Sequence, residues 1–177
     1  MQPAQRGTSL FSLAIALGLV AVLAATAAPG FERITRQWAA ARSASGLIAA
    51  LHQARSAAAA RAVPVVLCQT DVPGHCTTVG TPSGWQLFAD NSPTSPPRLD
   101  GADELLQAHT LAPSIELRVT RTAVTYWPTA RAASTASFIV CDRGNLASPR
   151  VVIVSQTGRP RLSQRLSDGS IPDCTGG

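Results

Sequence analysis

Residues 8–28 read TSLFSLAIALGLVAVLAATAA and contain no charge, no side-chain amide and no proline. An α-helix rises about 1.5 Å per residue, so this stretch spans about 31 Å, the thickness of a bilayer's hydrocarbon core. The helical pattern continues after Pro29 and Gly30, with apolar residues at spacings of three and four. We therefore expect one long helix from Thr8 to about Arg61, with a transmembrane first half (8–28) and an amphipathic second half (29–62).

The second half of this helix has one apolar face, and its other faces are polar and rich in arginine. Arginines and polar residues occupy the other faces, and Pro64 is a stop signal just after the last periodic residues. The expected apolar face is Phe31, Ile34, Trp38, Ala41, Ser45 and Ile48, with Leu47 and Leu51 beside it.

Composition limits the remaining chain to one domain and gives it a positive charge. The chain has 177 residues, a net charge of +5, and fifteen basic residues, every one of which is arginine. The planar guanidinium group suits bidentate contact with phosphate or carboxylate. The charge favours acidic partners such as nucleic acid or anionic lipid.

Four cysteines, Cys68, Cys76, Cys141 and Cys174, follow the apolar run. An even number of cysteines in an exported segment indicates two disulfides, and four cysteines allow three connectivities. We favour Cys68–Cys76 and Cys141–Cys174, which would stabilise the domain by about 2.5 and about 3.5 kcal/mol in the chain-entropy estimate. A zinc site is the competing interpretation, but the spacings match no common zinc motif.

Two processing schemes fit the N-terminus. Arg6 precedes the apolar run, which keeps the N-terminus cytoplasmic and sends the remainder outward. Residues 25–27 (Ala-Thr-Ala) resemble a signal peptidase site, and cleavage after Ala27 would release a soluble domain. The apolar run is longer than an ordinary signal core and continues into the amphipathic helix, which favours its retention.

The N-terminal residues resemble the class III signal of type IV pilins and type II secretion pseudopilins. A short leader (1–7) ends in Arg6-Gly7 and is followed by Thr8-Ser9-Leu10-Phe11 and the apolar helix. The resemblance implies that a prepilin peptidase cuts between Gly7 and Thr8. It also implies a single-pass inner-membrane protein with a periplasmic domain (63–177), which assembles with other pilin subunits on the cell surface. This chain has Ser12 where the family usually has glutamate.

The remainder of the chain has a β pattern, with short apolar runs between turn signals. An Ala-Arg-Ser patch at residues 54–56 precedes a strand that ends near Cys68, and residues 84–90 follow the pattern Gly-Trp-x-x-Phe-x-Asp. These features resemble the FimT/GspH minor pilin subfamily. We expect an α+β, type IV pilin-like fold in which an antiparallel meander packs on the second half of the helix. The expected strands are residues 63–69, 85–89, 115–120, 123–127, 137–141, 150–155 and 159–162.

The C-terminal arm, residues 143–167, contains five arginines and no acidic residue: Arg143, Arg150, Arg159, Arg161 and Arg165. In an extended chain, Arg159, Arg161 and Arg165 would share one side, with Pro160, Leu162 and Leu166 on the other. Pro160 lacks an N–H group and therefore favours an edge strand. Two interpretations remain open: the arginines grip nucleic-acid phosphates, or they only keep an exposed edge from aggregating.

Gly158-Arg159-Pro160-Arg161 matches the GRxR motif with which FimT-type minor pilins bind DNA in natural transformation. The resemblance implies contacts to the phosphate backbone, weak sequence preference and strong salt dependence. Aromatic residues that could stack on unpaired bases are Trp85, Tyr126 and Trp127, but for each of them a place in the core is the favoured interpretation.

Catalysis has little support in the sequence. His52, His75 and His109 lie in no nucleophile or metal motif, and we expect His52 on the helix and the other two in loops. We therefore expect no enzyme, cofactor or metal. The alternative function is a pseudopilin of a type II secretion system, which shares the anchor and fold.

Overall fold

A computed structural model describes residues 10–72, 74–77, 82–129 and 133–174. The described part contains one long helix, α1 (Leu10–Arg61), and eight β-strands. The chain divides into two compact units, one ending at Thr35 and one beginning at Arg36, and each is described by itself. The expected cleavage site between Gly7 and Thr8 lies outside the described residues.

The first unit is the apolar part of α1. Every side chain from Leu10 to Ala28 is exposed, including Phe11 at 74% and Leu23 at 68%. In the described part of the chain, α1 is the one helix long and apolar enough to cross a membrane, with a mean hydropathy of 2.4 in its most apolar window. A helix that is apolar on all sides fits a lipid environment or a site among other apolar helices.

The second unit begins with the amphipathic part of α1, whose buried face differs from the expected one. Trp38 is 73% exposed and Ser45 is exposed, so the predicted phase of the apolar face was wrong. The strands pack instead on a face that is rich in alanine, where small side chains let the backbone approach closely. This buried face consists of Ala40, Ser43, Ala44, Leu47, Ala50, Leu51, Ala54 and Ala58.

The end of α1 agrees with the sequence prediction. The helix stops at Arg61, and Ala62 adopts a left-handed conformation (φ 58°) in which its N–H group donates to the Ala58 carbonyl at 3.1 Å. This geometry satisfies one of the last helical carbonyls. Pro64 follows at once and prevents the helix from continuing.

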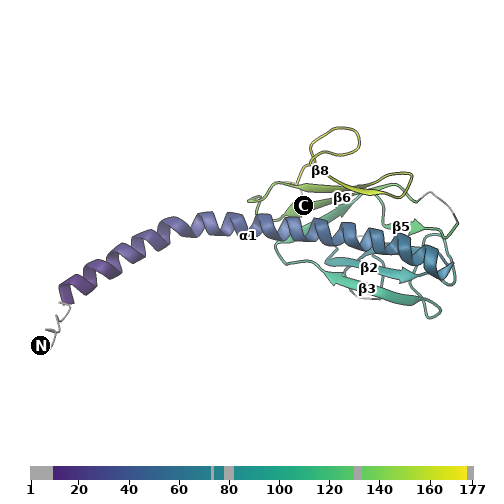
Figure 1. Cartoon of the computed structure of the whole chain (residues 1–177), viewed down its shortest axis with the longest axis horizontal. Coiled ribbons are helices and arrows are strands. Elements are labelled where there is room, and N and C mark those ends of the chain that lie inside the picture. Colours follow the sequence, from purple (N-terminus) through teal and green to yellow (C-terminus); the bar gives the residue numbers. More distant parts are fainter. Residues whose placement is uncertain (1–9, 73, 78–81, 130–132, 175–177) are drawn as a thin grey trace, which may run out of the picture. The chain divides into compact units, whose positions relative to one another are not determined.

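The strands form two four-stranded antiparallel sheets (Figure 1). The first sheet has the order β3-β2-β1-β5, and its members are β1 (Val65–Thr70), β2 (Gly84–Ala89), β3 (Glu104–Thr110) and β5 (Ala123–Tyr126). The second has the order β4-β6-β7-β8, and its members are β4 (Ile115–Val119), β6 (Ala136–Asp142), β7 (Arg150–Val154) and β8 (Pro160–Ser163).

Two parts of the strand prediction were wrong. A single meander was expected, but β1 lies between β2 and β5, and β4 joins the other sheet. Strand β3 was also missed, so His109 lies in a strand and not in a loop. The β3 sequence ELLQAHT has no β-branched residue before Thr110 and is mostly exposed or half-buried, which removes the local signals of a strand.

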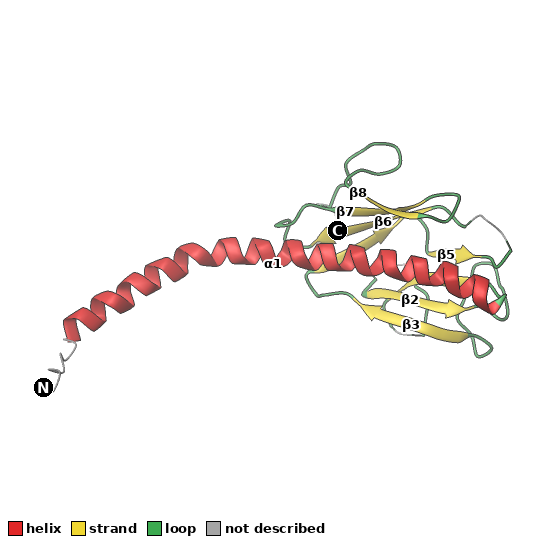
Figure 2. Cartoon of the chain, in the orientation of Figure 1, coloured by secondary structure: helices red, strands yellow, loops and turns green. Residues whose placement is uncertain are grey.

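One core joins α1 to both sheets, and Figure 2 shows the second part of the helix running alongside the strands. Leu47 and Leu51 of α1 contribute to it, together with Trp85 of the first sheet and Phe138 and Val152 of the second. Because these residues come from every layer, the two sheets are held together through the helix.

The disulfides are Cys68–Cys76 and Cys141–Cys174, the two pairs favoured from the sequence. Cys68 belongs to a small apolar cluster with Val66 and Phe88. Since Leu67 is in the main core, the alternation along β1 places this cluster on the opposite face of the first sheet. Cys174 attaches the C-terminal tail to β6.

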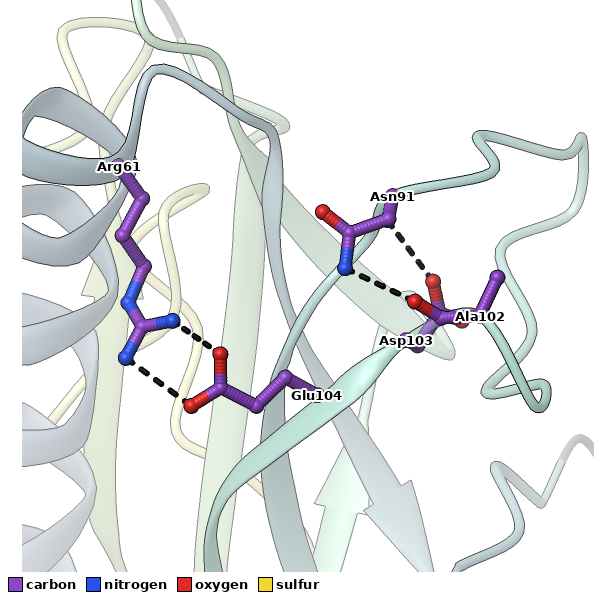
Figure 3. A network of polar contacts seen from close by, with 5 residues as sticks. All are labelled: Arg61, Asn91, Ala102, Asp103 and Glu104. Atoms are coloured by element: carbon purple, nitrogen blue, oxygen red, sulfur yellow. Dashed lines mark hydrogen bonds and ion pairs between the residues drawn. The ribbon is translucent and has the colours of Figure 1, made fainter.

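Polar contacts fasten the helix end and the loop between β2 and β3 (Figure 3). The guanidinium of Arg61 forms an ion pair with the Glu104 carboxylate through two hydrogen bonds. In the loop, the Asn91 side chain donates to the Ala102 carbonyl at 2.9 Å and its backbone N–H donates to Asp103 at 2.8 Å. These bonds join the end of α1 to β3 and close the proline-rich loop between β2 and β3.

Candidate nucleic-acid interface

The Gly-Arg-Pro-Arg segment begins in a tight turn after β7. The Gly158 N–H donates to the Ser155 carbonyl at 2.8 Å, and the Ser155 N–H donates to the Arg159 carbonyl at 3.2 Å. Gly158 has a φ of +73°, and a Cβ placed on it would lie 2.9 Å from Cε1 of Tyr126 and 3.1 Å from Cβ of Ala133. Both the backbone conformation and the available space therefore disfavour a side chain at this position.

Tyr126 holds this turn against the first sheet. Its hydroxyl donates to the Gly158 carbonyl at 3.0 Å. Burial raises the pKa of Tyr126 to about 12, against a smaller opposing effect of the Arg55 charge, so the phenol stays protonated and remains a donor at neutral pH. The Gln156 carbonyl also accepts a bond from the Ala133 N–H at 3.1 Å. The turn that precedes the two arginines is thus fixed from outside its own sheet.

Arg159 and Arg161 extend from the edge of the second sheet. β8 is the terminal strand of the order β4-β6-β7-β8, in agreement with the edge position expected from Pro160. Arg161 lies opposite Ile153 in the strand register, whereas Leu162 lies opposite Val152, a core residue. Directly paired residues share a face, so Arg161 is on the face away from the main core. Both arginines are exposed, and neither forms an ion pair with any described residue.

Arg165 was expected to continue this row, but it does not. The chain turns after β8: the Ser163 hydroxyl donates to the Arg165 carbonyl at 2.8 Å and accepts from its N–H at 3.0 Å. The Arg165 guanidinium then donates to the Gly169 carbonyl at 3.0 Å. Ser163 thus ends the extended segment, and Arg165 stabilises the tail loop.

Leu162 also departs from its expected packing, since 49% of its surface is exposed. Its partner Val152 is buried in the core, but the edge strand projects beyond that core.

Arg143 and Arg150 are not brought to the same place as Arg159 and Arg161. Arg150 begins β7 and lies opposite Val140, a core residue, so it is on the other face from Arg161. The whole of β7 also lies between Arg150 and the turn that contains Gly158, which at about 3.3 Å per residue is a distance of about 13 Å. Arg143 is exposed in the turn after β6, where its N–H donates to the Ser114 carbonyl at 2.9 Å.

Of the three aromatic residues considered for stacking, one is exposed. Trp127 is 44% exposed, whereas Trp85 is 1% and Tyr126 is 3% exposed. Trp85 stacks on the His109 ring with centroids 4.1 Å apart, and burial together with the Arg42 charge lowers the pKa of His109. Trp85 and Tyr126 are core residues, which is the interpretation favoured from the sequence, and this leaves Trp127 as the candidate for stacking.

Arg121, in the turn between β4 and β5, was not considered from the sequence. It is exposed and lines a cavity that Arg161 also lines. No local motif marks it, because the two residues are distant along the chain and border one cavity only when β4 and β8 become the outer strands of the same sheet. The described residues contain no group of three His, Cys, Asp or Glu side chains placed to hold a metal ion.

Comparison with known proteins identifies the family. The family model described as "Type II transport protein GspH" matches residues 43–158, more than half of the chain. The match ends at Gly158 and does not include Arg159 or Arg161. No curated protein matches the chain.

Two solved structures share the fold at low sequence identity. The type IV minor pilin FimU of Pseudomonas aeruginosa is 19% identical, with a TM-score of 0.51 over 70% of this chain and 87% of FimU. The minor pseudopilin EpsH of the type 2 secretion system of Vibrio cholerae is 12% identical, with a TM-score of 0.52 over 70% of this chain and 95% of EpsH. The long helix, the antiparallel sheets and the family match agree: the chain belongs to the GspH family and has the fold of type IV minor pilins and pseudopilins.

Proposed function

We propose that this protein is a minor pilin of a type IV pilus that binds DNA without sequence preference, through Arg159 and Arg161, for DNA uptake in natural transformation. The observation that supports this proposal is the pair of exposed guanidinium groups beside a turn that Gly158 and Tyr126 fix in place. Neither cation is paired with a carboxylate in the described part of the chain. Both are therefore available to phosphate oxygens, which bind the guanidinium fork bidentately.

The proposed location follows from the apolar first unit and the two disulfides. We infer that prepilin peptidase cuts between Gly7 and Thr8, and that residues 8–28 then span the inner membrane. Cys68–Cys76 and Cys141–Cys174 suit an oxidising compartment, so residues 63–177 are assigned to the periplasm before assembly with other pilin subunits. The mass of the mature chain tests this scheme, since cleavage after Ala27 would remove the apolar helix.

DNA binding is tested on the full chain in a non-ionic detergent, with a labelled duplex and fluorescence anisotropy. Two phosphate contacts give a slope of log K against log salt of about −1.8, or about a twelvefold loss of affinity between 50 and 200 mM salt. The variant Arg159→Gln with Arg161→Gln should lose most of the binding and most of this slope. The matched control is Arg42→Gln with Arg55→Gln, which removes the same charge from exposed positions on α1.

The two arginine pairs make the test specific to position. Equal weakening by both double variants would show that only net charge matters. Unchanged affinity after substitution of Arg159 and Arg161 would refute the proposed DNA contact and leave the edge-protection interpretation.

The alternative is a type II secretion pseudopilin with a structural role in protein export. The likeness to EpsH favours it as much as the likeness to FimU favours the pilus. Pilins and pseudopilins are structural proteins, so neither candidate is an enzyme. A deletion strain separates the two: the minor pilin is needed for DNA uptake, and the pseudopilin for release of secreted proteins.

A further inference from the structure

A cavity of about 530 Å³ lies beside Arg161 on the second sheet. Its walls come from segments that are distant in sequence: the turn between β4 and β5, the start of β6, the end of β7, β8 and the tail at Ser167. Two arginines and several hydroxyl side chains line it, among them Arg121, Arg161, Thr120, Thr135, Ser137 and Ser155.

The charges around this cavity have one sign. Arg121 and Arg161 are its only ionisable lining residues among those described, and neither forms an ion pair with a described residue. Two cations that border one cavity repel each other unless an anion lies between them. The cavity therefore favours a small anionic group.

The hydroxyl groups identify the kind of anion. The backbone holds two of them in place: Thr120 Oγ1 accepts from the Ser137 N–H at 2.9 Å, and Ser155 Oγ accepts from the Arg159 N–H at 3.3 Å. Both also have an acceptor for their own O–H group: the Ser137 carbonyl lies 3.5 Å from Thr120 Oγ1, and the Arg159 carbonyl lies 3.3 Å from Ser155 Oγ. The donors that remain for an anion are therefore the two guanidinium groups and the lining hydroxyls of Thr135, Ser137 and Ser167. Guanidinium forks and hydroxyl donors together are the groups that contact phosphate oxygens in protein–DNA complexes.

We propose that this cavity binds one backbone phosphate of DNA and that Arg121 is a third phosphate contact beside Arg159 and Arg161. The inference rests on the proposed DNA-binding function and deepens it, because it assigns the path of the strand. The DNA backbone crosses from the edge at Arg159, over Arg161, to the turn that contains Arg121. This direction leads from β8 across the end of the sheet and does not follow the C-terminal arm toward Arg165.

The test uses the full chain in non-ionic detergent and the same labelled duplex. The variant Arg121→Gln should weaken binding about eightfold at 0.1 M salt, since each lost phosphate contact lowers the salt slope by about 0.9. The matched control is Arg42→Gln, an exposed arginine of α1 that lines a different cavity. Arg121→Lys should restore most of the slope, because it keeps the charge at the same position.

The outcomes separate this inference from the function on which it rests. If Arg121→Gln matches Arg42→Gln while the Arg159 and Arg161 double variant loses binding, the phosphate cavity is refuted and the proposed function stands. If the unmodified protein does not bind the duplex, both are refuted. A drop of about 0.9 in the salt slope for Arg121→Gln, with no such drop for Arg42→Gln, supports the cavity.

Discussion

Replacing Gly158 by alanine tests whether the turn before the two arginines is built as described. A left-handed conformation costs a residue with a side chain about 1–2 kcal/mol, and Gly158 has a φ of +73°. The added Cβ would also lie 2.9 Å from Tyr126 and 3.1 Å from Ala133, and overpacking of this kind costs about 1–3 kcal/mol. Alanine lowers the entropy of the unfolded chain, which offsets about 0.4–1 kcal/mol. We expect Gly158→Ala to lower the free energy of unfolding by about 3 kcal/mol.

Gly169→Ala is the matched control within the same C-terminal arm. Gly169 also has a positive φ, +85°, but nothing lies within 4 Å of a Cβ placed there. It should therefore show the backbone cost alone, a net loss of about 1 kcal/mol. The difference between the two variants measures the collision with Tyr126 and Ala133.

The assay is urea unfolding of the full chain in detergent, followed by tryptophan fluorescence, which reports on the buried Trp85. The slope of free energy against urea should be the same in all variants if only the folded state is perturbed. Equal destabilisation by Gly158→Ala and Gly169→Ala would refute the argument. It would mean that the turn is free to move away from Tyr126 and does not fix the positions of Arg159 and Arg161.

Two further predictions concern the stability of the same domain. Replacing both Cys141 and Cys174 by serine should lower the free energy of unfolding by about 3.5 kcal/mol, and replacing Cys68 and Cys76 should lower it by about 2.5 kcal/mol. The reason is that the first bridge joins residues 33 positions apart and the second joins residues 8 positions apart. A larger loss for the Cys68 and Cys76 variant in urea unfolding would contradict the chain-entropy argument. Burial, followed by the charge of Asp103, raises the pKa of Asp90 above 3.8, so the folded state holds this proton more tightly than the unfolded state. Ionisation of Asp90 therefore destabilises the fold as the pH rises from 3.8 through its folded pKa, and this cost is absent below 3.8. Asp90→Asn should remove that pH-dependent loss of stability. The urea midpoints of the variant and the unmodified protein, measured between about pH 3 and about pH 7, should therefore become more similar as the pH falls. A constant difference between the two midpoints across this range would refute the raised pKa of Asp90.

Local sequence patterns were sufficient for the helix and for every strand except β3. The apolar run before Pro29 predicted the long helix, and Pro64 predicted its end, because helix formation and termination depend on residues close in the chain. The strands from β4 to β8 lie within a residue or two of their predicted bounds, since alternating and apolar runs reflect burial directly. Pro160 placed β8 at an edge because a missing N–H group is tolerated there.

The tertiary structure decided what depends on residues distant in the chain. The sheets pack on the face of α1 that has small side chains, so the alanines of that face are buried and Trp38 is exposed. The assignment of each strand to one of the two sheets depends on many weak pairings between distant segments, so no single segment predicts it. The same holds for the candidate site: the motif at residues 158–161 could be read from the sequence, but the departure of Arg165 and the placement of Arg121 and Arg161 around one cavity could not. Sequence determined which residues are charged, where the chain is helical and where every strand but β3 lies; packing alone determined which of those charges share a surface.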